Sequence, residues 1–95
     1  MLNISKEIKS RKKELEQITA GIFELLKKGE EKLVKEKFKE AISKMAQIYY
    51  LKMYVYESDL KMRSEYKQEK IDELMKEFNQ DKIKLAHIID ELSAK

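Results

Sequence analysis

The chain lacks the residues that interrupt helices. Its 95 residues include no proline, and Gly21 and Gly29 are its only glycines. Apolar residues recur at steps of three and four along most of the sequence, which is the spacing of one helix face. A charged fraction of 41% is well above that of an average globular domain and is typical of long helices or coiled coils. We therefore expect an all-α protein.

Three periodic segments predict three long helices. Residues 4–26 carry one apolar seam, and Lys27-Lys28-Gly29 predicts its end, because cations and a left-handed glycine both suit a helix C-terminus. A second helix is expected from Glu30 and a third after a turn near Ser64. A break at Asn79-Gln80-Asp81, or one helix through both positions, is the alternative. The approximate ranges are 3–28, 30–63 and 65–94, in a single helical domain spanning residues 1–95.

The middle of the second segment is apolar and aromatic on all sides. Residues 48–56 have high β-propensity, so a strand is the competing interpretation. Acid-first pairs at i,i+4, such as Glu31/Lys35 and Glu40/Lys44, favour a helix. A helix that is apolar all round must be covered all round, and two neighbouring helices cover only part of it. We therefore expect a helical bundle with coiled-coil-like seams, completed by homodimerisation into an antiparallel assembly. The residues expected at the dimer or partner contact are Met45, Tyr49, Leu51, Met53, Tyr54 and Tyr56.

One charged residue interrupts each apolar seam: Arg11 in the first, Lys52 in the second and Asp81 close to the third. One hypothesis pairs Asp81 with Arg11 or Lys52, within the bundle or between chains, because a buried charge needs a partner. The favoured interpretation is that the long basic side chains reach water and that Asp81 lies at a helix end.

Acidic residues recur every fourth position from Glu65 to Asp81, and His87 is the only histidine. A solvated face or a basic counterpart explains the acids better than a metal, because carboxylate bundle sites use Glu-x-x-His and Lys84 stands three residues before His87. His87 is expected beside the seam with a local hydrogen bond. The chain has no cysteine, no Gly-rich phosphate loop and no nucleophile with a neighbouring base. We expect no enzymatic activity, no cofactor, no metal and no small-molecule substrate.

Basic residues raise the possibility of nucleic-acid binding. The net charge is +3, and acidic residues interrupt every basic cluster, so a solvated face is the favoured interpretation. The candidate contacts to nucleic acid are Lys9, Arg11, Lys12, Lys13, Lys32, Lys35 and Lys39.

The leading functional hypothesis is a non-enzymatic protein-interaction module: an adaptor, a small regulatory subunit or an inhibitor protein, of a kind that viruses and mobile elements also encode. A homodimer, another protein or both are the expected partners. The alternatives are a basic nucleic-acid-associated helical protein and a structural oligomer or scaffold component. No signal peptide or stretch of about 20 apolar residues is visible. We therefore expect no membrane association and a cytoplasmic location, in the host if the protein is viral.

Overall fold

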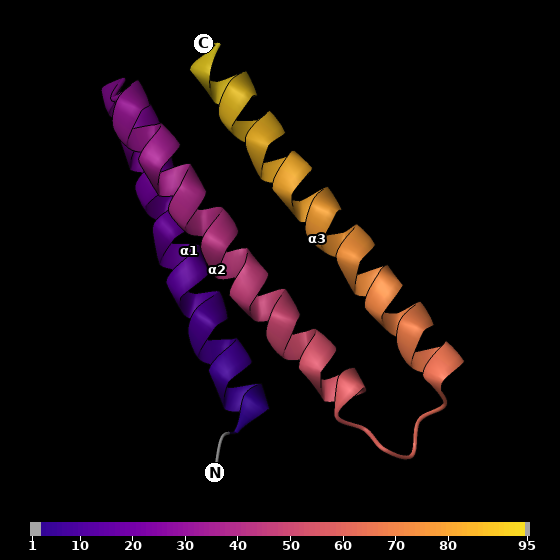
Figure 1. Cartoon of the computed structure of the whole chain (residues 1–95). Helices are drawn as coiled ribbons and strands as arrows, with labels where there is room; N and C mark the ends of the chain where they lie inside the picture. Colours follow the sequence, from indigo (N-terminus) through magenta and orange to yellow (C-terminus); the bar gives the residue numbers. More distant parts are fainter. Residues whose placement is uncertain (1–2, 95) are drawn as a thin grey trace.

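The computed structural model describes residues 3–94 and contains three α-helices (Figure 1). Helix α1 spans Ile4–Lys28, α2 spans Glu31–Glu57 and α3 spans Ser64–Ser93. No strand occurs among the described residues, so the all-α prediction is confirmed and the strand interpretation of residues 48–56 is wrong. No helix in this range has an apolar stretch long enough to cross a bilayer.

The turn between α1 and α2 forms as the sequence predicts. Gly29 adopts the left-handed conformation, with φ 72°. Its N–H donates to the Leu26 carbonyl, and the Glu30 N–H donates to the Leu25 carbonyl, both at 3.1 Å. These two bonds are the Schellman pattern, which satisfies carbonyls that the end of the helix leaves free. At the other end of α1, the side chain of Asn3 accepts the N–H of Lys6 at 3.1 Å and caps the first turn.

The end of α2 differs from the prediction. The helix ends at Glu57, six residues before the expected boundary, and residues 58–63 form a connection. Within it, the carboxylate of Asp59 accepts the N–H of Lys61 at 3.0 Å. This local bond offers the backbone an alternative to the helix. Ser64 begins α3 without capping it, and α3 runs unbroken through residues 79–81, so the alternative break there is wrong.

Helix α2 is the middle element of a flat layer. Figure 1 shows α1 and α3 lying on either side of α2, each antiparallel to it. Contacts are extensive between α1 and α2, fewer between α2 and α3, and very few between α1 and α3. The Cα atoms extend over 51 × 28 × 14 Å. The core that joins the three helices consists of Ile22, Val34, Ala41, Met45, Leu85 and Ile89.

This flat arrangement exposes a large surface. The chain has a solvent-accessible area of 7359 Å². A compact monomer of 11.4 kDa exposes about 5,800 Å² by the usual scaling of area with mass. The excess is roughly 1,600 Å² on that scaling, and it reflects the single-layer arrangement, which leaves both sides of the layer open.

The two glycines provide a matched test of this fold. Gly29→Ala is expected to lower the free energy of unfolding by about 1–2 kcal/mol, because alanine would have to adopt the left-handed conformation. Gly21→Ala is expected to raise it by about 0.5–1 kcal/mol, because Gly21 lies inside α1 and an added Cβ would meet nothing within 4 Å. Urea unfolding followed by circular dichroism measures both. Changes of the same sign would contradict the turn geometry.

Candidate interaction surfaces

The structure divides the predicted contact residues of α2 into two groups. Met45, Tyr49 and Met53 are at most 8% exposed and pack inside the chain. Tyr54 is 52% exposed, while Leu51 and Tyr56 are half-buried. The first three are therefore core residues, which leave a second chain little surface to contact.

The surface that α2 leaves open includes residues the sequence pattern did not single out. Tyr50 is 68% exposed and Val55 is 47% exposed. At about 100° per residue, Tyr50 and Tyr54 lie on the side of α2 opposite Met45, Ile48 and Lys52. Leu51 lies at the edge of that side, whereas Val55 lies next to Ile48. We call Tyr50, Leu51 and Tyr54 the tyrosine face. Of its members, the sequence prediction included Leu51 and Tyr54.

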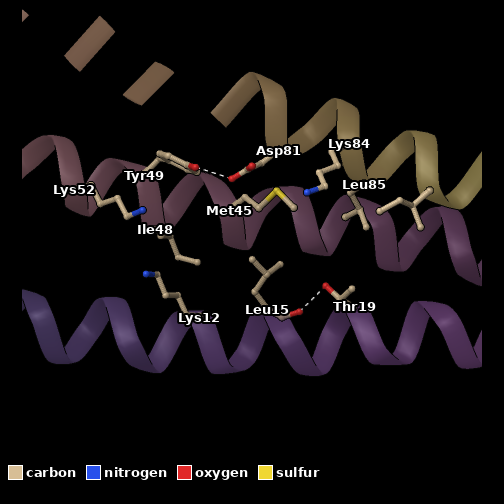
Figure 2. Close-up of a pocket in the computed structure, with 11 residues that line it drawn as sticks. Lys12, Leu15, Thr19, Met45, Ile48, Tyr49, Lys52, Asp81, Lys84 and Leu85 are labelled. Carbon is tan, nitrogen blue, oxygen red and sulfur yellow. Dashed lines mark hydrogen bonds between the residues drawn. The ribbon is translucent and has the colours of Figure 1, made fainter. Parts of the chain in front are cut away.

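Tyr49 connects α2 to α3. Its ring meets Phe78 edge to face, with centroids 5.3 Å apart. Its hydroxyl donates to Oδ2 of Asp81 at 2.6 Å (Figure 2). The ammonium of Lys52 lies 4.7 Å from the centroid of the same ring. Burial, and then the hydrogen bond to Asp81, raise the pKa of Tyr49 above its ordinary value. The contact therefore holds the phenol protonated between the two helices.

Asp81 pairs with neither Arg11 nor Lys52 within residues 3–94. Oδ2 of its carboxylate accepts the hydroxyl of Tyr49 instead. Asp81 also lies inside α3, not at a helix end. Arg11 donates to Oε1 of Gln47 on α2 and pairs with Glu7 at 3.5 Å, while its Nε is buried without an acceptor.

An ion pair that was not predicted connects α1 and α2. Lys44 of α2 meets Glu14 of α1. The hydrogen bond and the charge of Lys44 lower the pKa of Glu14. Both side chains border solvent, so this pair adds little stability and chiefly fixes how the two helices align.

The acidic series on α3 stays solvated. Glu65, Glu69 and Glu77 are exposed, and Glu73 pairs with Lys70 of its own helix at 3.4 Å. No group of three metal-ligating side chains forms within the described part of the chain. Nε2 of His87 lies 2.9 Å from Oε1 of Glu91 on the exposed side of the helix, which is the local interaction expected for it.

A groove runs between α1 and α3, with α2 as its floor (Figure 2). Its volume is ≈ 290 Å³. Each helix contributes one lysine: Lys12 from α1, Lys52 from α2 and Lys84 from α3. We call it the lysine groove. It is otherwise lined by Leu15, Thr19, Met45, Ile48, Tyr49, Asp81, Leu85 and Ile88.

A second hollow of ≈ 730 Å³ opens between the first turns of α2 and the last turns of α3. It combines apolar walls with charges of both signs, and we call it the terminal wedge. Its lining residues are Leu26, Gly29, Glu30, Glu31, Val34, Lys35, Phe38, Lys39, Ala86, Ile89, Asp90, Leu92 and Ser93.

The predicted nucleic-acid contacts fall into separate groups. Lys32, Lys35 and Lys39 are exposed near the α1–α2 turn, and the last two line the terminal wedge. Lys9 and Lys13 are exposed on α1, roughly four turns or more from Gly29. Because α1 and α2 are antiparallel, the two groups lie apart along the layer. Arg11 is turned toward Gln47, and Lys12 lines the lysine groove.

Comparison of the chain with protein-family models, curated protein sequences and solved structures finds no match. The function is therefore inferred from two features of residues 3–94: the tyrosine face and the lysine groove.

Removing one hydroxyl tests the link between α2 and α3. Tyr49→Phe is expected to lower the free energy of unfolding by about 1–2 kcal/mol near neutral pH, because a hydrogen bond to a charged acceptor is lost. Tyr50→Phe is the control, since the Tyr50 hydroxyl is exposed and has no partner among the described residues. Urea unfolding of both variants measures the difference, and equal stability would contradict the contact.

The same residue is expected to make the fold sensitive to alkali. The pKa of Tyr49 in the folded chain lies above the ordinary value of 10.0, so above that pH the unfolded chain ionises while the folded chain keeps the proton. Stability is complete below about pH 10 and falls as pH rises further. Unfolding measured at a series of pH values above 10 should show a smaller loss in Tyr49→Phe than in Tyr50→Phe. Identical slopes would contradict the assignment.

Proposed function

We propose that the chain is a non-enzymatic, cytoplasmic protein-interaction module that pairs with a second copy of itself through the tyrosine face. The supporting observation is that α2 carries large apolar side chains on the side away from both of its neighbours. Tyr50 and Tyr54 are each more than half exposed. Helical adaptors, small regulatory subunits and inhibitor proteins act through surfaces of this kind.

The chemistry of the face suits a protein contact. Tyrosine buries a large ring while its hydroxyl keeps a hydrogen bond, and it is enriched in the centres of interfaces. At about 100° per residue, Ser43, Gln47 and Ser58 extend the same strip, and the exposed Glu57 lies at its end. Lys44 stands at its edge and is turned toward Glu14 of α1. The centres of protein–protein interfaces likewise contain few charged residues.

A second copy is the occupant that the strip favours. A two-fold axis brings a surface against an identical one, and a strip with no charge at its centre allows this contact. Each chain exposes roughly 1,600 Å² more than a compact monomer of its mass. Obligate dimers bury about 2,000–5,000 Å² in total, so the excess is comparable to the area that each of their subunits buries. The separated lysine groups give less support to the nucleic-acid alternative, which needs one continuous basic face.

Sedimentation velocity across a range of concentrations tests this proposal. The wild-type chain is expected to assemble into dimers. Tyr50→Ser combined with Tyr54→Ser is expected to raise the dissociation constant at least about a hundredfold, because central tyrosines contribute much of the energy of such contacts. Tyr66→Ser is the control, since Tyr66 is 46% exposed in the first turn of α3, outside the tyrosine face.

Circular dichroism should show the same helix content in all three proteins. A wild-type chain that remains monomeric at every concentration would refute the proposal. Equal assembly of the double variant and the wild type would refute the assignment to the tyrosine face, and assembly beyond a dimer would favour a scaffold component.

A further inference from the structure

The shape of the lysine groove suits the binding of a fourth helix. Helices α1 and α3 lie on either side of α2 and scarcely meet each other, so α2 forms the floor of an open trough. In four-helix bundles, a helix in this position contacts both outer helices along one face. The trough is not an enclosed cavity of the kind that holds a small ligand.

The floor and walls of the groove are largely aliphatic. Leu15 comes from α1, Met45 and Ile48 come from α2, and Leu85 and Ile88 come from α3. Leu15 and Ile88 are half-buried, so they retain surface that an apolar stripe can cover. A helix with apolar residues at steps of three and four presents such a stripe.

The charges of the groove are unbalanced. Lys12 and Lys84 are exposed and Lys52 is half-buried, and Figure 2 shows all three extending into the groove. Among residues 3–94, none of the three forms an ion pair with an acid. Asp81 is the only acid in the lining, and its carboxylate accepts the hydroxyl of Tyr49. Three ammonium groups from three helices therefore face one apolar trough without an acidic partner, and that of Lys52 lies over the ring of Tyr49.

An aliphatic trough with a cationic rim selects a helix with an apolar stripe and acidic flanks. A nucleic acid fits less well, because Tyr49 is the only aromatic residue in the lining and it is buried, so bases have no stacking platform. The acids of a second copy also fit less well. Glu65, Glu69, Glu73 and Glu77 advance about 40° around α3 at each step, so they do not flank a continuous stripe.

We propose that the lysine groove binds an acidic amphipathic helix of another protein, with Lys12, Lys52 and Lys84 contacting its carboxylates. This inference rests on the proposed function as an interaction module, but it uses the side of α2 opposite the tyrosine face. A chain that pairs through one side keeps the groove free on the other.

A designed peptide provides the probe. One fluorescein-labelled peptide carries leucine at the a and d positions of about three heptads, with glutamate beside them, and its partner replaces every glutamate with lysine. The full chain is expected to bind the acidic peptide, with an affinity that falls as salt rises. Fluorescence anisotropy should show at least about tenfold weaker binding of the basic peptide.

Matched charge reversals locate the site. Lys12→Glu, Lys52→Glu and Lys84→Glu together are expected to weaken binding of the acidic peptide at least about tenfold. The control combines Lys13→Glu, Lys32→Glu and Lys76→Glu, which makes the same change in net charge at exposed lysines of the same three helices. The control should keep wild-type affinity apart from a small loss that salt removes. Thermal unfolding verifies that both variants fold, and Lys52→Gln replaces Lys52→Glu if the groove variant does not.

Three results would overturn the inference. Equal weakening by both sets of substitutions would mean that net charge alone drives binding. A duplex DNA oligonucleotide that displaces the peptide from the wild type, and that binds the control but not the groove variant, would assign the groove to nucleic acid. Loss of self-association in the groove variant would mean that a second copy covers it.

The same sedimentation assay separates the two proposals. A chain that dimerises through the tyrosine face but does not bind the acidic peptide refutes only the groove. A chain that binds the peptide and remains monomeric supports the groove and refutes only the self-association.

Discussion

The structure depends on how α2 is covered. Helices α1 and α3 pack against α2 from different directions and scarcely meet each other. The strip of α2 between them forms the floor of the groove, and the opposite side of α2 remains exposed. On the α1 side the left-handed Gly29 sets the tight turn. On the α3 side the ring of Tyr49, packed on Phe78 and bonded to Asp81, fixes how α3 lies. Both open surfaces of the molecule follow from this incomplete coverage.

Local patterns account for most of the helical structure. The three- and four-residue apolar spacing predicted all three helices, and the Lys-Lys-Gly sequence predicted the end of α1 to the residue. The end of α2 was misplaced because it depends on a side-chain bond from Asp59 to the backbone of Lys61, which apolar periodicity does not register. Hydrophobic spacing shows that a face is buried, whereas a local polar competitor determines where the helix stops.

The surfaces were harder to predict because they depend on the angles at which the helices meet. Residues 48–56 have no polar side from which the outward direction could be read, so Tyr49 was expected at a partner contact, whereas it packs against α3. The partner of Asp81 was missed for a related reason. A carboxylate next to an apolar seam suggests a cationic partner. The way α2 packs against α3 instead places the hydroxyl of Tyr49 beside Asp81. Lys12, Lys52 and Lys84 are far apart in sequence and converge only in the folded chain.

The connectivity of the helices also sets how quickly the chain can fold. Nearly all packing occurs between helices that follow one another in sequence, through a two-residue turn and a six-residue connection. Contacts of such short range need little loop closure, and helical domains of low contact order reach their native state in microseconds to milliseconds. Because α1 and α3 hardly touch, the α1–α2 hairpin can form before α3 docks. During synthesis, which proceeds from the N-terminus, the first two helices can therefore pair while the third is still being made.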